Sequence, residues 1–296
     1  MIGVTRRQER RGVLLIAGAA LLWSTAGVGI KALDDPPLKV VFFRCAIAAV
    51  VLLVYFRPRL RLSPGVLAGL GCYVACLVTF VTATKWTTAA NAIFLQYSGV
   101  VWVLLLSPIV LKEPLKARDA AAIAVAFVGM ALLFVGKFEA RGRAGDVIAL
   151  LSGLFFAGLI LTLRRERGVG AETIVTWGSV VTSAVVFPFV VSDLSLTPSS
   201  ALAYLLLGVF QLAAAYVCFV RGVRFVTATE AAALGAFGAL ILGAIVFTVL
   251  LVKRRDFTVY AFDPVHAHAI GLSPRLLGAA LLGLLALVVL FIGNTL

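Results

Sequence analysis

Ten apolar segments follow one another along the chain, and each is long enough to cross a bilayer as a helix. A helical span needs about 20 predominantly apolar residues. The polar connections are mostly short, so the pattern predicts an all-α polytopic membrane protein without a soluble catalytic domain. The predicted spans are residues 12–33, 38–56, 64–84, 87–111, 117–136, 145–163, 172–191, 199–222, 227–252 and 275–293.

The order of residue types repeats between the two halves of the chain. Residues 80–92 read as an apolar run, a cation, an aromatic residue, a threonine and then a polar residue, and residues 219–231 follow the same order. The halves 1–137 and 138–296 each hold five spans, and an odd number of crossings turns the second half upside down. The pattern therefore predicts two inverted five-helix repeats around a central cavity, a plan typical of secondary transporters.

Composition favours a membrane protein, because 62% of the residues are hydrophobic, 13% are charged and the mean hydropathy is +1.10. The net charge is +13, but the cations are spread over the connections, which argues against a nucleic-acid partner and favours orientation signals. Their bias predicts a cytoplasmic N-terminus, although the cations at 137–143 and 253–255 oppose it. The first apolar run lacks a small-residue cleavage site before a polar sequence, so we interpret it as a retained helix.

The sequence contains none of the motifs that carry common enzyme chemistry. There is no phosphate-binding glycine loop with a lysine, no zinc-protease helix motif and no nucleophile elbow, so we expect neither an enzyme nor a cofactor. Cys72 and Cys76 share a helical face without a nearby histidine or carboxylate, which favours packing over a metal site. His266 and His268, with Asp263 close by, are either solvated loop residues or a metal pair.

Small residues at about every fourth position predict where helices approach each other closely in a membrane. The ninth span begins with a separate signal, since Thr227 and Glu230 have the spacing of a capping box. Glu230 is therefore either a helix cap or a proton-coupling carboxylate. The small-residue stretches are Ala68, Cys72 and Cys76; Gly145, Ala149, Gly153 and Ala157; Gly235, Ala239 and Gly243; and Gln211, Ala215, Cys218 and Gly222.

Polar residues inside the predicted spans are the main candidates for solute contacts, because each is costly in lipid and faces a cavity or another helix. Arg44 in the second span is the costliest, and it either snorkels or pairs structurally near the outer surface, or it contacts the solute. Asn91, Ser98 and Trp102 fall on one face of the fourth span by helical spacing. A helix–helix hydrogen bond explains this stripe as well as a cavity does.

Further candidates lie beside this stripe and in other spans. Gln96 and Tyr97 flank the stripe, and we expect one of them to face the cavity. Trp23 projects beside small residues and is either a pocket wall or a packing residue. Lys85 matches Arg224 in the repeat, and both are better explained as anchors at helix ends than as solute contacts. The remaining candidates inside the spans are Tyr73, Phe80, Trp177, Gln211 and Tyr216.

Several stretches carry a resemblance to a known family: residues 80–97, 105–108 and 111–114, Phe43–Ala46 in the second span, and Gly129 in the fifth. They resemble the EamA-type drug/metabolite transporters. Leu22–Thr25 is similar to the YddG-type aromatic amino-acid exporters within that family, which adds Ser24 to the candidates. The resemblance implies ten helices, both termini in the cytoplasm, a central cavity between inverted halves, and export of amino acids or related metabolites.

The chain departs from this family from about residue 235 onward. The turn after the ninth span is much longer than its counterpart after the fourth, and residues 260–274 are more similar to the cytoplasmic coupling segment of metal-uptake ABC permeases. An ATP-driven metal importer, with a separate nucleotide-binding partner, is therefore the alternative function.

The leading interpretation is a secondary transporter of a bacterial-type inner membrane that acts as a monomer. It would export an aromatic or other hydrophobic amino acid, or a related small metabolite, by alternating access. Aromatic walls suit such a solute, because ring stacking adds about 0.5–1.5 kcal/mol beyond the burial of area. The predicted partners are accordingly the small solute and the lipid bilayer.

Overall fold

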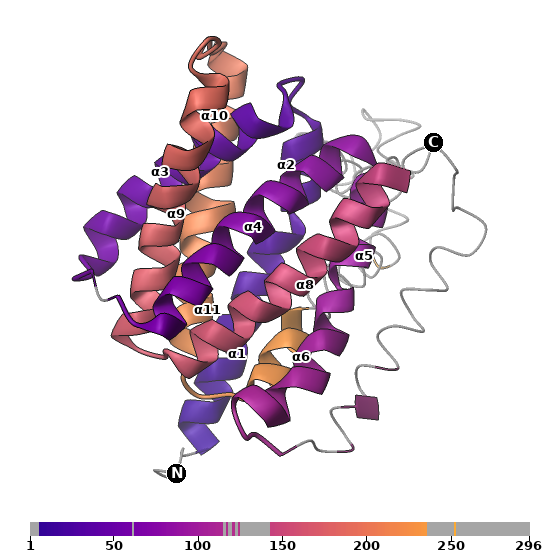
Figure 1. Cartoon of the computed structure of the whole chain (residues 1–296), viewed down its shortest axis with the longest axis vertical. Coiled ribbons are helices and arrows are strands. Elements are labelled where there is room, and N and C mark those ends of the chain that lie inside the picture. Colours follow the sequence, from indigo (N-terminus) through magenta and orange to yellow (C-terminus); the bar gives the residue numbers. More distant parts are fainter. Residues whose placement is uncertain are drawn as a thin grey trace, which may run out of the picture. The chain divides into compact units, whose positions relative to one another are not determined.

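The computed structural model describes residues 6–60, 62–114, 117, 120–121, 124, 143–235 and 252. All regular secondary structure within these ranges is helical (Figure 1). The helices are α1 (Arg6–Ser24), α2 (Ala26–Lys31), α3 (Pro37–Phe56), α4 (Pro64–Trp86), α5 (Ala89–Gln96), α6 (Ser98–Val110), α8 (Arg143–Arg165), α9 (Val169–Val190), α10 (Pro198–Leu206), the π-helix η1 (Leu207–Ala214) and α11 (Ala215–Gly222).

Seven of the predicted spans are confirmed as helical segments long and apolar enough to cross a membrane. They are Arg6–Lys31, Pro37–Phe56, Pro64–Trp86, Asn91–Leu111, Arg143–Arg165, Val169–Val190 and Pro198–Gly222. The spans predicted at 117–136, 227–252 and 275–293 lie largely outside the described residues, as do Gly129, His266 and His268. The arrangement as ten helices in two inverted repeats stays a prediction.

The chain divides into two units, Met1–Gly238 and Ala239–Leu296. All the helices given above belong to the first unit, which therefore contains spans from both predicted repeats. Within this unit α4 packs along α8, α3 along α9, and α1 along α11 (Figure 1). Each of these pairs joins one predicted repeat to the other, so the core of the unit is shared between them.

Side chains before the first turn explain where several helices begin. The Ser63 hydroxyl accepts a hydrogen bond from the Val66 N–H at 3.1 Å, directly before Pro64 at the start of α4. Thr88 caps α5 in the same way, accepting from the Asn91 N–H at 3.1 Å. Such caps satisfy N–H groups that have no partner inside the helix, and proline is favoured in the first turn because its missing N–H is not needed there.

The predicted capping box at the start of the ninth span is confirmed. The Thr227 N–H donates to Glu230 Oε2 at 3.0 Å, and the Glu230 N–H donates to Thr227 Oγ1 at 3.2 Å. The two residues thereby satisfy each other's backbone donors. The carboxylate of Glu230 thus has a structural role at this helix end.

Three spans are irregular within their length. The first is interrupted at Thr25 between α1 and α2, the fourth at Tyr97 between α5 and α6, and the one that ends with α11 contains the π-helix η1. The fourth span was predicted as one continuous helix over 87–111, and the interruption at Tyr97 corrects this. At membrane depth such irregular backbone occurs where protein buries it or a cavity adjoins it, and π-helical turns are frequent at functional sites.

The short helix α2, directly after the interruption at Thr25, packs closely against α5 and η1. A Cβ atom added to Gly27 in α2 would lie 3.1 Å from the Cβ of Ala89 in α5. A Cβ atom added to Gly29 would lie 2.6 Å from a methyl carbon of Leu207 in η1. The short helix α2 therefore packs against α5, which precedes the interruption at Tyr97, and against η1, and its two glycines permit this close approach.

The small-residue stretch in α8 forms the close helix contact that the sequence predicts. A Cβ atom on Gly153 would lie 2.7 Å from the Gln96 carbonyl oxygen and 2.6 Å from Ser98 Oγ. One on Gly99 would lie 2.5 Å from the carbonyl oxygen of Gly153. The backbone of α8 thus lies directly against the interruption between α5 and α6, and any side chain at Gly153 would separate them.

The stretch that ends at Gly222 marks a second close crossing, between α1 and α11. A Cβ atom on Gly12 would lie 3.2 Å from the Gly222 carbonyl oxygen, and one on Gly222 would lie 2.9 Å from the Gly12 carbonyl oxygen. Small residues at both positions allow the two helices to approach closely. In lipid the hydrophobic effect does not drive helices together, so such close packing helps to hold them in contact.

Candidate functional site

Aromatic rings from both predicted repeats meet in the interior of the described unit. The Trp23 ring in α1 contacts Phe156 of α8 at a centroid distance of 5.9 Å, and Tyr216 and Phe219 of α11 at 5.3 and 5.1 Å. Tyr73 of α4 extends this ring cluster, with its ring 5.1 Å from that of Tyr216. Edge-to-face and tilted pairs of this kind are the favoured aromatic geometries.

The sequence singles out Trp23, Tyr73 and Tyr216 and misses Phe156 and Phe219. Phe219 follows Tyr216 by three residues, which places both on one helical face, and that spacing was the available signal. Phe156 carries no comparable signal, because its role depends on how α8 approaches α1. Trp23, Phe156, Tyr73, Tyr216 and Phe219 together are called the ring cluster below.

Tyr73 is held in place by a hydrogen bond to α9. Its hydroxyl lies 2.7 Å from Ser179 Oγ, and Ser179 Oγ also lies 2.9 Å from the Val175 carbonyl oxygen. Since a serine hydroxyl has one proton, Ser179 donates to Val175 and Tyr73 donates to Ser179. Tyr73 is fully buried, so this bond satisfies a phenol that would otherwise lack a partner.

Arg44 is the largest polar side chain of the described interior. It lies in α3, is 1% exposed, and neither Nε nor Nη1 has a hydrogen-bond partner. Its helix packs against α4, which carries Tyr73, and against η1, which continues into α11 with Tyr216, so Arg44 lies on a helix next to the ring cluster. No partner for these two nitrogen atoms lies among the described residues, and both expected roles of Arg44, at the outer surface or in contact with the solute, stay predictions.

Other predicted candidates also have buried polar atoms that find no hydrogen-bond partner in the described part of the chain. They are the Oε1 of Gln211 in η1, the Nε1 of Trp177 in α9 and the Oγ of Ser98 at the start of α6. Buried polar atoms are normally hydrogen-bonded, and exceptions in a membrane interior call for a ligand or another explanation. Arg44, Gln211, Trp177 and Ser98 are thus the candidates whose polar atoms are available to a solute.

Gln96 and Tyr97, between which the sequence could not choose, both make contacts inside the protein. The Gln96 side-chain amide donates to Ser152 Oγ of α8 at 2.9 Å. The Tyr97 hydroxyl donates to the carbonyl oxygen of Gly235 at 3.2 Å. Both residues thereby fix the interruption between α5 and α6 to neighbouring helices.

The stripe predicted from Asn91, Ser98 and Trp102 is not a single face, because the helix is interrupted between the first two residues. Asn91 is 5% exposed and its amide donates to Thr87 Oγ1 at 3.5 Å, close to the helix end. Trp102 is 42% exposed, on the surface of α6. The helical-spacing argument fails here because it assumes an unbroken 100° rotation per residue.

The remaining candidates are Ser24, Phe80 and Lys85, and each has a local structural role. The Ser24 hydroxyl donates to the Leu21 carbonyl oxygen at 2.7 Å, next to the interruption at Thr25. Phe80 is a buried core residue at 6% exposure. The Lys85 ammonium donates to the Leu33 carbonyl oxygen, which fits its predicted role as an anchor at a helix end.

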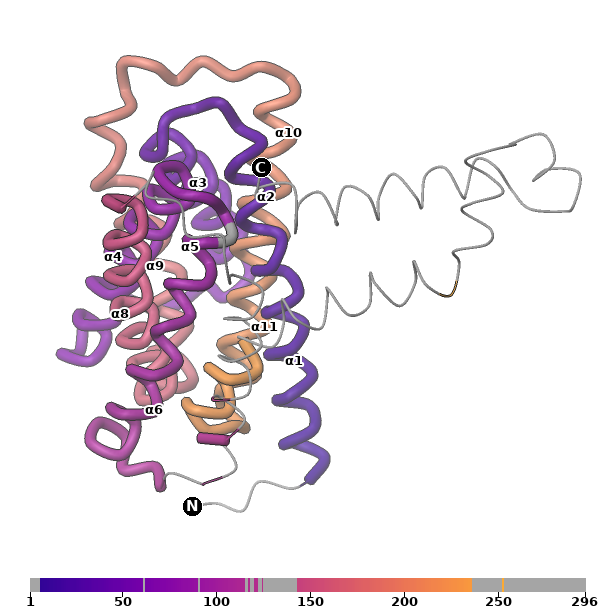
Figure 2. Tube along the Cα trace, turned by 90° about the vertical axis from the view of Figure 1, so that its right-hand side faces the viewer, coloured from indigo at the N-terminus to yellow at the C-terminus, as the bar shows by residue number. Residues whose placement is uncertain are grey.

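Two groups of polar contacts tie the predicted repeats together at opposite ends of α9. At one end, Lys39 Nζ of α3 lies 2.9 Å from Asp35 and 3.0 Å from Asp193, and the Tyr204 hydroxyl donates to Asp35 at 2.6 Å. Figure 2 shows this end, where the α2–α3 and α9–α10 connections lie side by side. Asp35, Lys39, Asp193 and Tyr204 are called the Lys39 network. Ser195 and then Lys39 hydrogen-bond Asp193 and lower the pKa of its carboxyl to about 2.

The second group lies where α8 ends and α9 begins. Arg164 Nε donates to Glu113 Oε1 at 2.7 Å, and its Nη1 donates to the Val223 carbonyl oxygen at 2.8 Å. The other carboxylate oxygen of Glu113 accepts from the Ala228 N–H at 2.9 Å. Glu113, Arg164, Val223 and Ala228 are called the Glu113 network. A helix as long as α9 separates the two networks by roughly 30 Å.

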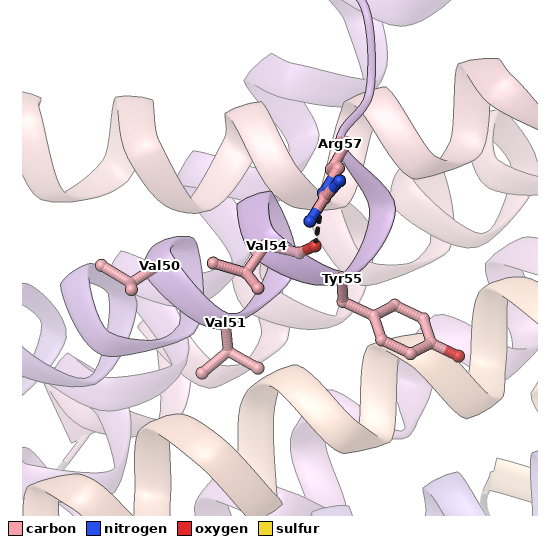
Figure 3. Close-up of a pocket in the computed structure, with 5 residues that line it drawn as sticks. All are labelled: Val50, Val51, Val54, Tyr55 and Arg57. Atoms are coloured by element: carbon pink, nitrogen blue, oxygen red, sulfur yellow. Dashed lines mark hydrogen bonds between the residues drawn. The ribbon is translucent and has the colours of Figure 1, made fainter.

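A surface groove of about 730 Å³ lies at the C-terminal end of α3, apart from the ring cluster (Figure 3). Its walls are three valines, with Tyr55 and Arg57 at its edge. The Arg57 Nε donates to the Val54 carbonyl oxygen at 3.4 Å, and the Arg221 guanidinium lies 5.0 Å from the Tyr55 ring centre. Its exposed valines fit lipid contact better than recognition of a polar solute.

No group of three or more metal-ligating side chains occurs among the described residues. Cys72 and Cys76 are free thiols, and Cys76 Sγ accepts a hydrogen bond from the Gln96 amide at 3.8 Å. Cys72 lies opposite Gly158 of α8, which agrees with the packing role predicted for it.

Comparison with known proteins places most of the chain in one family. The EamA-like transporter family model matches residues 10–135 and 143–262. An uncharacterized transporter of Helicobacter pylori strain J99 is 30% identical over 170 residues, which cover 53% of this chain and 56% of that protein. One solved crystal structure has a TM-score of 0.68 at 19% identity, covers 96% of this chain and 97% of its own, and shows a shared fold.

The C-terminal segment matches a different family. The ABC 3 transport family model matches residues 236–294. A probable iron transport system membrane protein of Haemophilus influenzae is 49% identical over 49 residues, or 17% of this chain and 18% of that protein. The chain thus spans 56% of the Helicobacter protein and a small part of the Haemophilus protein. Except for Val252, this segment lies outside the described residues.

Proposed function

We propose, since the chain belongs to the EamA-like transporter family, that it exports an aromatic or other hydrophobic amino acid, or a related small metabolite. It does so by alternating access across the plasma membrane, as a monomer with a cytoplasmic N-terminus, and without converting the solute chemically. Membership of the family supports a transport function in a multi-pass membrane protein. The side chains in the interior of the described unit support the class of solute.

The observation that carries this proposal is the ring cluster beside buried polar groups. Aromatic walls bind a flat apolar side chain, and the nearby Arg44 and Gln211 offer unpartnered polar atoms to the charged end of an amino acid. The rings come from helices of both predicted repeats, which is where inverted-repeat carriers bind their solutes.

Alternating access is supported by the two polar networks at opposite ends of α9. The Lys39 network joins α3 to the α9–α10 connection, and the Glu113 network joins the end of α6 to α8. Each connects one predicted repeat to the other, so each holds its end of the interface together. A carrier that opens to one side must break one network while the other stays formed.

The test is efflux from liposomes that contain only the purified chain. We expect labelled phenylalanine to leave faster than from empty liposomes, without ATP and without a second polypeptide. Trp23→Ala removes three ring contacts, and a loss of about 1.4 kcal/mol would reduce phenylalanine transport about tenfold while affecting alanine less.

Trp86→Ala is the matched control, because Trp86 is 55% exposed and lies outside the ring cluster. It should leave phenylalanine efflux near the wild-type rate. If Trp23→Ala reduced the transport of all solutes equally, the residue would only stabilise the fold. Absence of amino-acid efflux from protein that is folded would contradict the proposed solute class.

The second candidate function is a permease subunit of an ATP-driven metal importer. It is favoured only by the match of residues 236–294 to the ABC 3 transport family. That function requires a nucleotide-binding partner, so solute movement that depends completely on an added ATPase subunit would reverse the order of the two proposals.

A further inference from the structure

We propose that the guanidinium of Arg44 is the binding site for the carboxylate of the transported solute, and that Trp23, Tyr73 and Tyr216 bind the rest of it. The inference rests on the proposed function and specifies its solute as an organic carboxylate with an apolar body.

Arg44 is a buried charge that has no counter-ion among the residues the structure describes. An arginine side chain does not lose its proton in proteins, so the guanidinium stays charged even at 1% exposure. Among the described residues, Asp35 and Asp193 pair with Lys39, and Glu113 and Glu172 pair with Arg164 and Arg224, so these acids are engaged at the helix ends. No acid of the described ranges forms an ion pair with Arg44.

Such a charge is destabilising unless something pairs with it. Leaving a buried ion without a partner is among the costliest features of a protein interior, and ionisable residues within membrane spans usually mark solute pathways. Within the described ranges, Nε and Nη1 of Arg44 have no hydrogen-bond partner. A guanidinium presents its N–H groups in a planar fork that matches the two oxygens of a carboxylate, which fits this anion well.

The backbone next to Arg44 provides a second, independent observation. A Cβ atom on Gly208 would lie 3.1 Å from the Arg44 carbonyl oxygen, so the π-helix η1 packs directly on α3 at this residue. Gln211 follows three residues later in η1, is 4% exposed, and its Oε1 has no partner. An amide oxygen accepts hydrogen bonds from an ammonium group, so a solute with both groups finds a partner for each.

The ring cluster gives the other half of the solute a place. The helix of Arg44 packs against α4, which carries Tyr73, and against η1, which leads into α11 with Tyr216. The rings of Tyr73 and Tyr216 lie 5.1 Å apart, and Trp23 contacts Tyr216 at 5.3 Å. Apolar ring faces are therefore supplied by helices that pack next to the one that carries Arg44. The site should accept 3-phenylpropionate, which keeps the carboxylate, and reject phenethylamine, which lacks it.

The experiment measures binding of these two probes to the purified full chain, by isothermal calorimetry in detergent micelles. We expect saturable binding of 3-phenylpropionate by the wild-type protein and at least tenfold weaker binding of phenethylamine. Arg44→Gln should weaken the binding of 3-phenylpropionate at least tenfold, and Arg44→Lys should recover part of the lost affinity. Arg57→Gln removes a charge from the exposed end of the same helix and should leave both affinities unchanged.

Thermal unfolding without solute separates a binding role from a structural one. If Arg44 is an unpaired charge kept for the solute, Arg44→Gln should melt at the wild-type temperature or above it. A structural arginine would give a clearly lower melting temperature together with equal losses for both probes, and that result would overturn the proposal. Absence of saturable 3-phenylpropionate binding to the wild-type protein would overturn it as well.

The outcomes also separate this inference from the proposed function. Binding that depends on Arg44, combined with no amino-acid efflux from liposomes, would refute the exporter and leave the carboxylate site in place. Efflux of phenylalanine by the wild-type protein, combined with wild-type 3-phenylpropionate affinity in Arg44→Gln, would refute the carboxylate site and leave the exporter in place.

Discussion

Glu113→Gln is expected to destabilise the contact between the predicted repeats at the end of α8. The substitution keeps the size of the side chain and removes its charge. In the structure, one carboxylate oxygen of Glu113 accepts from Arg164 at 2.7 Å and the other from the Ala228 N–H at 2.9 Å. Glutamine has one acceptor oxygen, so one of these donors would face an amide NH₂ group instead.

The magnitude follows from the charge and burial of the pair. A hydrogen bond to a charged group contributes about 1.5–3 kcal/mol, and removing one partner of a buried pair costs about 3–5 kcal/mol. The side chains of Arg164 and Glu113 are 13% and 14% exposed, so solvent screens the pair only in part. Arg164 also keeps its bond to the Val223 carbonyl oxygen. We therefore expect a loss of about 2–4 kcal/mol in the free energy of unfolding.

The assay is a double-mutant cycle on unfolding in detergent, with Glu113→Gln, Arg164→Gln and the double variant. A direct ion pair predicts a coupling energy of at least about 1 kcal/mol between the two sites. Glu9→Gln, at an exposed position in α1, is the control and should change stability by less than about 0.5 kcal/mol. Strictly additive effects of the two single substitutions would refute the reasoning.

Three further predictions concern stability. Gly153→Ala should lower the free energy of unfolding by about 1–3 kcal/mol, because the new Cβ would lie 2.7 Å from a backbone oxygen. Gly18→Ala is the control, because its Cβ would meet no atom within 4 Å and should not lower stability. Equal effects of the two substitutions in thermal unfolding would contradict this prediction. The pKa of Asp193 is lowered from 3.8 to about 2, so its stabilising contribution is complete above about pH 4 and is lost as the pH falls through about 2. Asp193→Asn should therefore flatten the acid limb of the melting profile, and an unchanged limb would count against the pairing. Tyr73→Phe should cost about 0.5–1.5 kcal/mol through its lost bond to α9, and the exposed Tyr55→Phe should cost less, which chemical unfolding of the two variants can compare.

Hydropathy was sufficient to predict the seven spans because each helix must satisfy its own backbone in lipid. The capping box of Thr227 and Glu230 was also predictable, since its contacts are local in sequence. The interruption at Tyr97 was not, because it depends on how closely α8 approaches at Gly153. Helical spacing therefore placed Asn91 and Trp102 on one face, whereas the structure buries one and exposes the other.

The candidate site was predictable in its residue types and not in its contacts. Arg44 and Gln211 stood out in the sequence because polar side chains are rare in apolar spans. Burying such a group in a membrane is costly, so it usually has a functional or structural role. Whether Arg44 has a counter-ion depends on the positions of acids on other helices, and these were unknown before the fold. Phe156 was missed for the same reason, since only the packing of α8 brings its ring to Trp23.

The crossing of α1 and α11 at Gly12 and Gly222 has a consequence for how the molecule tolerates change over evolutionary time. Each glycine faces the carbonyl of the other, with no room for a methyl group on either side. Neither glycine belongs to the ring cluster, yet both should stay nearly invariant among relatives that keep this crossing, because any larger residue separates the helices. A survey that equates invariance with solute recognition would therefore select two residues whose task is to let one helix lie against another.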